Sequence, residues 1–516
     1  MSSAQLGGVI AESLAAAGVG EVVVCPGSRS TPIVVGLAAS AAAGRLRLHT
    51  RTDERGAGFL ALGLARATGI AAIVVTSGSA VGNLLPAVME ARASGVPLIV
   101  LSADRPATLV GTGANQTTRQ AGIFGCQVVA DLQLNSADAN PAAWAQACYR
   151  IVAQARGVRT NEPGPVQVNA ACAEPFQAAS GHWTLPRPPA WQPRPTPPAI
   201  GLPPGPRTVV LAGDAPLGVG RTARRVAEQA RVPLLAEPSS NARAGSCAIA
   251  GYRLLLDGAL GERIERVVVF GHPTLSRPVL RLVSRPGIDL VVVSHRASWP
   301  DPGWRAGRVA DAVELAPAGD DWLTDWLAAD RSRPDPLANR GPITGPELAA
   351  RVVAGCRGNV VFGASNPIRD ADLAPIAAEP PICWANRGLA GIDGLLATAQ
   401  GIALGSAAAT TLLLGDLSFL HDVGSLHLPA GQPEPRLRIV VADDNGGSIF
   451  AGLEVARQTP QLLAGLFTMP HGRDLVRLAA GFGWPAHRVT ERTALLAALA
   501  APITGLEVLV VPVAAR

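Results

Sequence analysis

The segment VVADDNGGSIF, from Val440 to Phe450, joins a short apolar run to a cluster of two aspartates, an asparagine and two glycines. An apolar β-branched run that stops abruptly at polar residues is typical of a buried strand followed by a loop. Asp-Asn-Gly-Gly also forms ordinary turns, so a turn explains this stretch as well as a ligand site does. Other segments of the sequence are needed to decide between a turn and a ligand site.

Similar apolar runs recur along the whole chain and alternate with Ala-rich stretches of helical character. Examples are EVVVCPGS, AAIVVTSGS, RTVVLAGD, RVVVFGHP, GNVVFGAS and TTLLLGD. Continuous apolar runs indicate strands buried on both faces, as in parallel sheets covered by helices. The sequence therefore predicts an α/β fold of three consecutive doubly wound parallel-sheet domains, with ligand sites beyond the carboxyl ends of the strands.

Two breaks set the expected domain boundaries. Between residues 183 and 206, 10 of 24 residues are proline, which is incompatible with a continuous helix or a central strand. A second break, rich in proline and glycine, begins near residue 331. We therefore expect domains at 1–182, 207–330 and 343–516, joined by linkers at 183–206 and 331–342.

The composition excludes several classes of function. All 44 basic residues are arginine, so the chain has neither a Schiff-base lysine nor a lysine-bearing phosphate loop. Aromatic residues make up only 4% and no Arg-rich run is interleaved with them, which argues against nucleic-acid binding. Arginines suit acidic small-molecule substrates, because the guanidinium binds a carboxylate through two hydrogen bonds.

Cysteine usage and hydropathy indicate a cytoplasmic protein. The seven cysteines are scattered without a C-x-x-C motif, so neither a disulfide framework nor a zinc site is expected. The N-terminus carries Glu12 and no basic start, unlike a signal peptide. The uncharged span from Gly394 to Gly415 contains polar residues and glycines, so we expect a buried helix leading into the strand TTLLLG and no membrane insertion.

A further acid follows the strand before the opening stretch. Asp416 comes directly after TTLLLG and precedes Asp444 by 28 residues, which leaves room for one helix-containing crossover between neighbouring parallel strands. Two carboxylates, an asparagine and a glycine carbonyl are hard oxygen ligands of the kind that Mg²⁺ prefers. Such an ion usually completes its shell with phosphate oxygens, so the pair predicts a diphosphate anchored through Mg²⁺ (or Mn²⁺).

This arrangement resembles the diphosphate-binding motif of thiamine diphosphate enzymes, which usually ends in two asparagines. Asp443 and Asp444 stand at those positions in this chain. The resemblance implies that Asp416, Asp444 and the carbonyl of Gly446 bind the metal. It implies these further cofactor contacts: Ser365, Ile392, Asn445, Gly447 and Ile449. An aspartate in place of asparagine keeps an oxygen ligand and adds negative charge.

The same family uses a glutamate from another subunit to hydrogen-bond the aminopyrimidine ring of the cofactor. Glu54, in HTRTDERGAGFLALGLA, precedes a Gly- and Ala-rich helix, where a glutamate is also explained as a favourable charge on the helix dipole. The resemblance implies three domains of the thiamine diphosphate enzyme type, with residues 1–182 binding the pyrimidine ring and 343–516 the diphosphate. It also implies a homodimer or homotetramer with active sites between subunits.

Six segments in the same order narrow the resemblance. They are PGSRSTPI, DERGAGFLALGLA, ADRP with GTGANQ, GASNPIRD, NRGLAGIDG and GGSIF. Together they are similar to the menaquinone-pathway synthases that make 2-succinyl-5-enolpyruvyl-6-hydroxy-3-cyclohexene-1-carboxylate (SEPHCHC). That family decarboxylates 2-oxoglutarate and adds the succinyl part to isochorismate by 1,4-addition. Ile392 would bend the cofactor, although an ordinary core isoleucine explains this residue equally well.

Both substrates carry two carboxylates, so the implied site needs arginines and neutral hydrogen-bonding groups. The implied substrate-binding residues are Ser28, Arg29, Arg105, Asn115, Gln116, Arg277, Ser365, Arg369, Arg387 and Phe450. Gln116, Arg369 and Arg387 join Glu54 as the implied catalytic residues. Phe450 would exclude water from the reacting carbon.

Two alternatives share these features. Another thiamine diphosphate-dependent 2-oxo acid decarboxylase, or an acetolactate synthase-like carboligase, has the same fold, glutamate and metal motif, and would release or form a different product. A nucleotide-binding or regulatory protein that keeps the fold without catalysis is the alternative of another class, because the usual asparagine pair is missing. Decarboxylation of 2-oxoglutarate that depends on added cofactor and Mg²⁺ would distinguish an enzyme from this non-catalytic protein.

Overall fold

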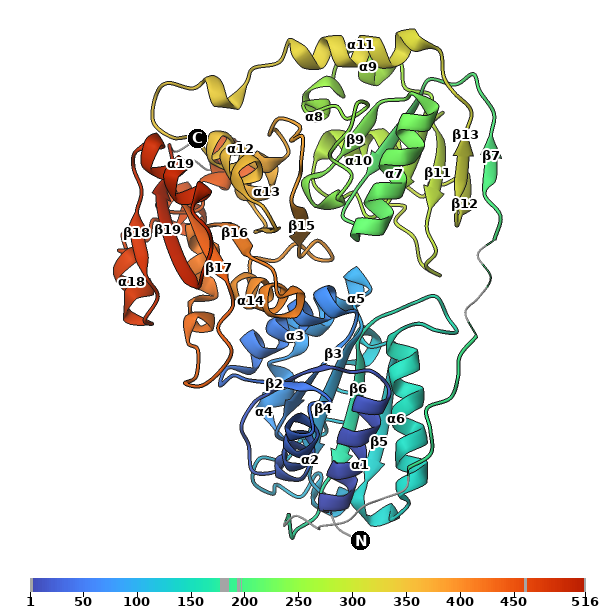
Figure 1. The fold of residues 1–516 in the computed structure, drawn as a ribbon, viewed down its shortest axis with the longest axis vertical. Coiled ribbons are helices and arrows are strands. Elements are labelled where there is room, and N and C mark those ends of the chain that lie inside the picture. Colours follow the sequence, from blue (N-terminus) through green and yellow to red (C-terminus); the bar gives the residue numbers. More distant parts are fainter. Residues whose placement is uncertain (1–2, 177–184, 193–194, 196, 459–461, 515–516) are drawn as a thin grey trace. The chain divides into compact units, whose positions relative to one another are not determined.

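The computed structural model describes residues 3–176, 185–192, 195, 197–458 and 462–514. The chain forms two compact units. The first consists of Met1–Arg194, Asp393–Ala408 and Asp422–Pro435, and the second of Pro195–Ile392, Ala409–His421 and Arg436–Arg516. Three large sheets organise these units, one in the first and two in the second (Figure 1).

The first unit contains a six-stranded parallel sheet with the strand order β2-β1-β3-β4-β6-β5. Its strands are β1 (Glu21–Val24), β2 (Arg47–Thr50), β3 (Ala71–Val75), β4 (Leu98–Asp104), β5 (Ala130–Asn135) and β6 (Val166–Ala171). Val22 and Val24 of β1 join one apolar core, and Val23 joins the other. Burial on both faces explains why this strand reads as a continuous apolar run.

Helices cover both faces of the first sheet (Figure 1). One core takes its helical side chains from α1 (Ser3–Ala16), α2 (Thr31–Ala42) and α6 (Pro141–Ala155). The other takes them mainly from α3 (Glu54–Thr68), α4 (Ser79–Gly82) and α5 (Leu85–Ser94).

Helix α14 (Leu395–Ser406) also belongs to the first unit and packs closely against α3. A Cβ on Gly63 would lie 2.1 Å from the carbonyl oxygen of Thr398, and a Cβ on Gly401 would lie 2.2 Å from that of Leu60. Glycine at these positions therefore allows the two backbones to approach. The buried helix expected for the uncharged span of the sequence is confirmed, and it leads into strand β16 (Thr410–Gly415).

The second unit contains a five-stranded parallel sheet with the order β12-β11-β10-β8-β9. Its strands are β8 (Thr208–Ala212), β9 (Leu234–Ala236), β10 (Arg266–Phe270), β11 (Asp289–Val293) and β12 (Arg308–Ala310). Its longer helices are α7 (Leu217–Ala230), α10 (Arg277–Ser284) and α11 (Asp320–Arg331). The short strands β7 (Ile200–Leu202) and β13 (Val313–Leu315) pair separately in parallel.

The third sheet, also in the second unit, has six parallel strands in the order β15-β14-β16-β17-β19-β18. Besides β16, its strands are β14 (Asn359–Phe362), β15 (Ile382–Ala385), β17 (Leu437–Asp443), β18 (Ala486–Arg488) and β19 (Leu506–Pro512). Helices near it include α12 (Gly345–Gly355), α13 (Asn366–Ala371), α15 (Asp416–His421), α18 (Leu475–Gly481) and α19 (Arg492–Ala500).

The three sheets share one winding pattern. Numbered within its own sheet, each begins 2-1-3-4, and the two six-stranded sheets have the identical order 2-1-3-4-6-5. In each, the order reverses between the first and third strands, which defines a doubly wound sheet. The predicted fold class is therefore confirmed. The predicted boundaries stay a prediction, because the compact units join the second and third sheets and assign α14 to the first.

Among the described helices, none combines the length and the apolar composition needed to cross a bilayer.

Candidate active site

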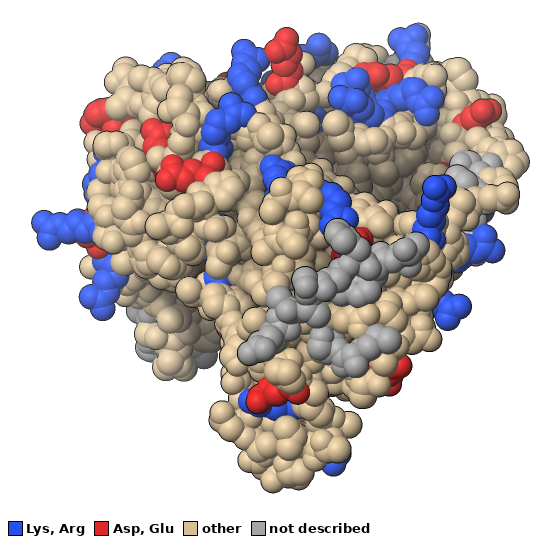
Figure 2. Space-filling model, turned by 60° about the horizontal axis from the view of Figure 1, so that its bottom comes forward, with Lys and Arg blue, Asp and Glu red and all other residues tan. Residues whose placement is uncertain are grey.

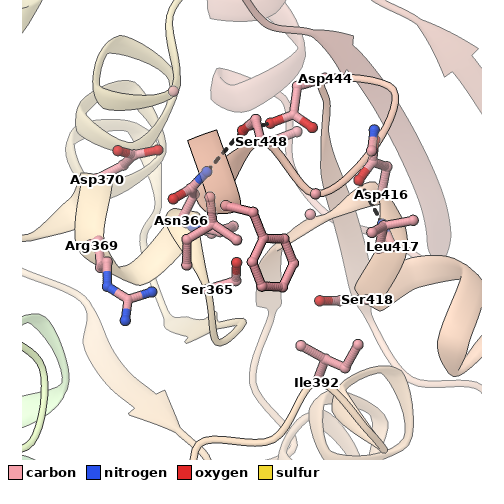
Figure 3. Close-up of a pocket in the computed structure, with 18 of the residues that line it drawn as sticks. Ser365, Asn366, Arg369, Asp370, Ile392, Asp416, Leu417, Ser418, Asp444 and Ser448 are labelled. Atoms are coloured by element: carbon pink, nitrogen blue, oxygen red, sulfur yellow. Dashed lines mark hydrogen bonds between the residues drawn. The ribbon is translucent and has the colours of Figure 1, made fainter. Parts of the chain in front are cut away.

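A cavity of about 410 Å³ opens in the second unit at the carboxyl edge of the third sheet. Its lining includes residues that follow three neighbouring strands: Ser365 after β14, Asp416 after β16 and Asp444 after β17 (Figure 3). Strands β14 and β16 flank the point where the strand order reverses, and ligands bind at this point in open parallel sheets. The cavity is therefore the candidate active site.

Asp416 begins helix α15 and is only 2% exposed. Its Oδ1 accepts a hydrogen bond from the N–H of Leu417 at 2.6 Å, and its Oδ2 accepts one from the N–H of Gly446 at 2.8 Å. Burial and the neighbouring carboxylate of Asp444 raise the pKa of Asp416 to about 6, because both disfavour its charged form. The end of β16 thus carries a buried acid that is bonded to the loop after β17.

Asp444 supplies a second carboxylate. Its Oδ2 accepts a hydrogen bond from Ser448 Oγ, which in turn accepts one from Asn366 Nδ2 at 3.0 Å (Figure 3). Its Oδ1 is buried and has no hydrogen-bond partner among the described residues. An unsatisfied carboxylate oxygen beside a second acid is a donor set that suits a hard divalent cation. The residues at these two strand ends therefore fit the expected metal.

The glycines after β17 are required by close backbone packing. A Cβ on Gly446 would lie 2.4 Å from the carbonyl oxygen of Thr468, and the N–H of Gly447 donates to the same oxygen at 2.5 Å. Asn445 has a left-handed backbone (φ 61°), and its Oδ1 accepts a hydrogen bond from the N–H of Gly472 at 2.8 Å. Gly446 and Gly447 line the cavity, whereas the side chain of Asn445 holds the neighbouring loop.

His471 is a neighbour of Asp416 that no sequence motif indicated. Its Nε2 lies 3.1 Å from Asp416 Oδ2 and 3.6 Å from Asp443 Oδ1. One possible ligand atom from each of these three residues lies within 4.8 Å of the other two. This cluster is an alternative set of metal ligands that shares Asp416 with the predicted set.

Two arginines bring positive charge to the cavity. Arg369 on α13 and Arg387 in the loop after β15 both line it. Burial lowers the pKa of Arg369, and the neighbouring cations Arg387, Arg253 and Arg277 lower it further. The guanidinium of Arg369 makes no ion pair with a described residue. A cation held among other cations without a carboxylate partner favours an anionic ligand.

Apolar side chains complete the lining. Ile392 comes from the loop before α14, and Ile449 and Phe450 come from the loop after β17. The Phe450 ring packs against Phe467 with 5.6 Å between centroids. In the close-up, Ile392 lies across the cavity from Asp444 (Figure 3). These side chains make the cavity suitable for a reaction from which water is excluded.

Ser365 has a left-handed backbone at the start of α13, with φ 76°. Few residues other than glycine adopt such a conformation, and backbone strain of this kind concentrates at functional sites. The predicted cofactor-binding serine therefore stands at a strained position of the cavity lining.

Arg277 does not appear in the cavity lining. Its guanidinium pairs with both carboxylate oxygens of Glu454, at nitrogen–oxygen distances of 2.5 and 3.0 Å. The side chains of Arg277 and Glu454 are 63% and 62% exposed. Because Arg277 still adds to the positive field at Arg369, its contact with a substrate stays a prediction.

The remaining predicted arginines lie in the first unit, at the carboxyl edge of its sheet. Arg29 follows β1 and Arg105 follows β4. Burial lowers the pKa of Arg29 and neighbouring Arg105 lowers it further, so two like charges meet at this edge. Arg29 also donates to the carbonyl oxygen of Cys172 at 3.0 Å and lies 4.6 Å from the centroid of the Phe176 ring. Its Nη2 lies 3.4 Å from Oε1 of Glu174, an exposed carboxylate that partly compensates its charge. These contacts hold Arg29 next to a second cation at this sheet edge.

Gln116 is fixed at the end of β3. Its Nε2 donates to the carbonyl oxygen of Ser77 at 2.9 Å, and Ser77 Oγ donates to the carbonyl oxygen of Gln116 at 3.0 Å. Gln116 has a left-handed backbone (φ 55°). Ser28 and Asn115 are exposed on loops of the same unit. The sheet edge thus carries polar groups whose contact with a substrate stays a prediction.

Glu54 is the first residue of α3 and is half-buried. Its Oε2 accepts a hydrogen bond from Asn83 Nδ2 at 3.4 Å. Asp53 caps the helix by accepting a hydrogen bond from the N–H of Arg55 at 3.0 Å. This position is compatible both with a cofactor contact and with a favourable charge on the helix dipole.

Four polar residues near the cavity received no role from the sequence. Asn366 and Ser448 lie inside the quoted segments GASNPIRD and GGSIF, and Thr274 lies in the loop after β10. Each follows a buried strand, so inspection of every polar residue after an apolar run would have found them. His471 follows no such run, and no sequence signal separates it from a surface histidine.

Comparison with known proteins identifies the family. Residues 4–123 match the family model described as thiamine pyrophosphate enzyme, N-terminal TPP binding domain. A SEPHCHC synthase of Kineococcus radiotolerans is 46% identical over 98% of this chain and 95% of its own. The chain belongs to the SEPHCHC synthase family. A SEPHCHC synthase of Nocardioides is 45% identical over 97% of this chain and 93% of its own. One of Mycobacterium avium is 39% identical over 97% of this chain and 95% of its own.

Family membership decides between the main prediction and its alternative. The SEPHCHC synthase family is favoured over the decarboxylase and acetolactate synthase-like alternative, because relatives with that name match nearly the whole chain. The match to the N-terminal family model makes thiamine diphosphate the cofactor. The roles of individual residues stay predictions.

Proposed function

We propose that the protein is a C–C bond-forming transferase that decarboxylates 2-oxoglutarate and adds the succinyl part to isochorismate, giving SEPHCHC and CO₂ in menaquinone biosynthesis. The similarity to proteins named SEPHCHC synthase over nearly the whole chain carries this proposal. The cavity supports it, because an acidic pair suited to a metal-bound diphosphate lies with arginines suited to carboxylates.

The acidic pair would anchor the cofactor. Asp416, Asp444 and the carbonyl of Gly446 are the proposed ligands of Mg²⁺ (or Mn²⁺), and the unsatisfied Oδ1 of Asp444 supports this assignment. Ser365 and Ile392 would contact the cofactor from the strained start of α13 and the apolar side of the cavity. When bound, thiamine diphosphate supplies the electron sink for the loss of CO₂ from a 2-oxo acid.

Glu54 would hydrogen-bond the aminopyrimidine and hold a proton at its ring nitrogen. Glu54 belongs to the first compact unit and Asp416 to the second. We therefore propose a homodimer or homotetramer in which Glu54 of one subunit serves the cavity of another. The proposed location is the cytoplasm, and the seven cysteines, which are all free thiols in the structure, are consistent with it.

The arginines would bind the substrate carboxylates. Arg369 and Arg387 line the cavity and are the proposed partners of 2-oxoglutarate. Arg29, Arg105 and Gln116 at the edge of the first sheet are the proposed partners of isochorismate. Ile449 and Phe450 would exclude water from the reacting carbon, which would otherwise be protonated before it attacks isochorismate.

Mass spectrometry of the product tests this function. The enzyme is incubated with thiamine diphosphate, Mg²⁺, 2-oxoglutarate and isochorismate, with one component omitted in each control. We expect SEPHCHC only in the complete mixture. Free aldehyde as the main product would favour the decarboxylase alternative, and absence of any cofactor-dependent CO₂ release would favour a non-catalytic protein.

A further inference from the structure

Arg387 is hydrogen-bonded to Thr274, which lies in the loop after β10 of the five-stranded sheet. Its Nε and Nη2 both donate to the hydroxyl oxygen of Thr274, at 3.1 and 2.9 Å. Arg387 is only 6% exposed, and both residues line the cavity. Two nitrogens of a planar guanidinium bonded to one oxygen fix the direction of the whole group.

The remaining terminal nitrogen of Arg387, Nη1, makes no hydrogen bond within the described part of the chain. Because Arg387 is largely buried and lines the cavity, this nitrogen is a donor that stays available to a ligand. With Nε and Nη2 engaged, the guanidinium presents the edge that carries Nη1. A donor that is already oriented binds a carboxylate oxygen at a lower entropy cost than a mobile arginine side chain does.

The backbone of Thr274 is held in place by the buried carboxylate of Glu237. Oε1 of Glu237 accepts hydrogen bonds from the N–H of Thr274 at 3.0 Å and from the N–H of Leu275 at 2.9 Å. Glu237 is 1% exposed and comes directly after β9, while Thr274 comes four residues after β10. The loop that carries the threonine is therefore fixed by a buried acid from a neighbouring part of the same sheet.

This arrangement reaches the cavity from the carboxyl edge of the five-stranded sheet. Strands β9 and β10 lie on either side of β8 in that sheet, so the reversal of strand order falls between β8 and β10. Residues at such an edge are available for ligand contacts. Among the described residues that line the cavity, this edge contributes Thr274, an uncharged side chain that is hydrogen-bonded to the charged Arg387.

We propose that Thr274 is a positioning residue that orients Arg387 toward a substrate carboxylate, and that Glu237 holds the Thr274 loop in the required place. The inference rests on the proposed function, because it takes Arg387 as a contact of an acidic substrate. It adds a specificity-determining role for the loop after β10 of the five-stranded sheet, and this role depends on the hydroxyl group of Thr274.

A matched pair of substitutions isolates that hydroxyl. Thr274→Val keeps the shape and removes the acceptor, whereas Thr274→Ser keeps the acceptor and removes a methyl group. Since Thr274 is half-buried, both variants are expected to fold. Kinetics are measured with the complete holoenzyme, varying 2-oxoglutarate and isochorismate in turn, and cofactor affinity and melting temperature are recorded for each variant.

We expect Thr274→Val to raise the KM for at least one of the two acids about tenfold, the size of effect that follows from losing one well-placed hydrogen bond to a charged group. Its kcat, cofactor affinity and melting temperature should stay close to those of the parent. Thr274→Ser should restore most of the KM. A purely structural role would instead change melting temperature and cofactor affinity in both variants.

Arg387→Ala separates failure of this inference from failure of the proposed function. If Arg387→Ala raises the KM strongly while Thr274→Val matches the parent, the positioning role is wrong and the substrate site stands. If Arg387→Ala and Thr274→Val both match the parent, the assignment of Arg387 to the substrate is wrong as well. If Thr274→Ser is impaired as much as Thr274→Val, the hydroxyl is not the operative group and the inference is overturned.

Discussion

Asp416 and Asp444 are acids at neighbouring strand ends, and burial together with the charge of Asp444 holds the pKa of Asp416 at about 6. Two neighbouring carboxylates that are both negatively charged repel each other unless a proton or a cation compensates the charge. The buried Oδ1 of Asp444, which has no hydrogen-bond partner among the described residues, points to a cation. The metal site and the cofactor site are therefore expected to be linked.

We expect Asp416→Ala and Asp444→Ala to weaken binding of thiamine diphosphate at least about tenfold in the presence of Mg²⁺, because each removes a charged ligand. Asp444→Asn keeps an oxygen ligand and should bind the cofactor nearly as well as the parent. Calorimetric titration of the cofactor, with Mg²⁺ and with a chelator, measures these differences. Equal affinity of the parent in chelator would contradict the metal assignment.

Asp443→Ala is the matched control for the choice of ligands. Asp443 is the adjacent acid and belongs to the alternative cluster with His471. If the predicted ligands are right, Asp443→Ala should leave the Mg²⁺ dependence of cofactor binding nearly unchanged. A large loss in Asp443→Ala and His471→Ala, with little change in Asp444→Ala, would instead assign the metal to the alternative cluster.

A site shared between subunits should be recoverable by mixing. Glu54→Gln and Asp416→Ala are each expected to abolish activity, since one removes the proposed contact to the aminopyrimidine and the other a metal ligand. After dissociation and reassembly of the two variants together, hybrid oligomers should contain some cavities with both groups intact and regain part of the activity. Hybrids that assemble correctly and remain inactive would place Glu54 and Asp416 of one chain in the same site.

The strand ends of this fold could be predicted because central strands bury both faces. β1, β8 and β17 read as continuous apolar runs, so the polar residue after each one is conspicuous. Two of the edge strands gave no such signal: β2 reads RLHT and β18 reads AHR, with exposed or half-buried side chains except for one buried histidine in β2. A strand that is only partly buried does not need apolar residues at every position, so it cannot be recognised in the sequence as an apolar run.

The supporting contacts of the cavity could not be predicted, since they depend on distances between segments that are remote in the sequence. Thr274 and Arg387 are 113 residues apart and meet through one hydroxyl oxygen. His471 and Asp416 are 55 residues apart; Asp416 begins helix α15, whereas His471 lies in the loop before α18. A single sequence indicates which side chains follow strands, but it does not indicate which of these loops meet.

The buried acid Glu237 should make stability depend on pH. Burial raises the pKa of Glu237 from 4.5 to about 8, so the folded protein holds a proton that the unfolded chain releases above pH 4.5. The stabilisation from this proton is complete below about pH 4.5 and is lost as the pH rises toward 8, at about 1.4 kcal/mol per pH unit. Glu237→Gln, which cannot titrate, should remove this part of the pH dependence.

Unfolding of the cofactor-free parent and of Glu237→Gln, followed at pH 5.5 and 7.5, measures this effect. The stability of the parent relative to the variant should fall between the two pH values. Since Gln keeps an oxygen that accepts the N–H groups of Thr274 and Leu275, substrate KM values should stay near those of the parent. Parallel pH profiles of the two proteins would show that Glu237 is ionised in the folded state at both pH values.

The division of the two acidic substrates among the arginines decides how the enzyme orders its reaction. Arg369 lines the cavity of the second unit, whereas Arg29 and Arg105 lie at the sheet edge of the first. Losing one charge-assisted contact to a carboxylate should cost about 1.5–3 kcal/mol, or roughly tenfold to a hundredfold in transition-state stabilisation. Arg29→Ala and Arg105→Ala should raise the KM for isochorismate and leave CO₂ release from 2-oxoglutarate intact. Arg369→Ala should impair CO₂ release itself. Single-turnover CO₂ release and product formation, measured separately, distinguish these outcomes; equal loss of both steps in all three variants would show that the substrates share their arginines.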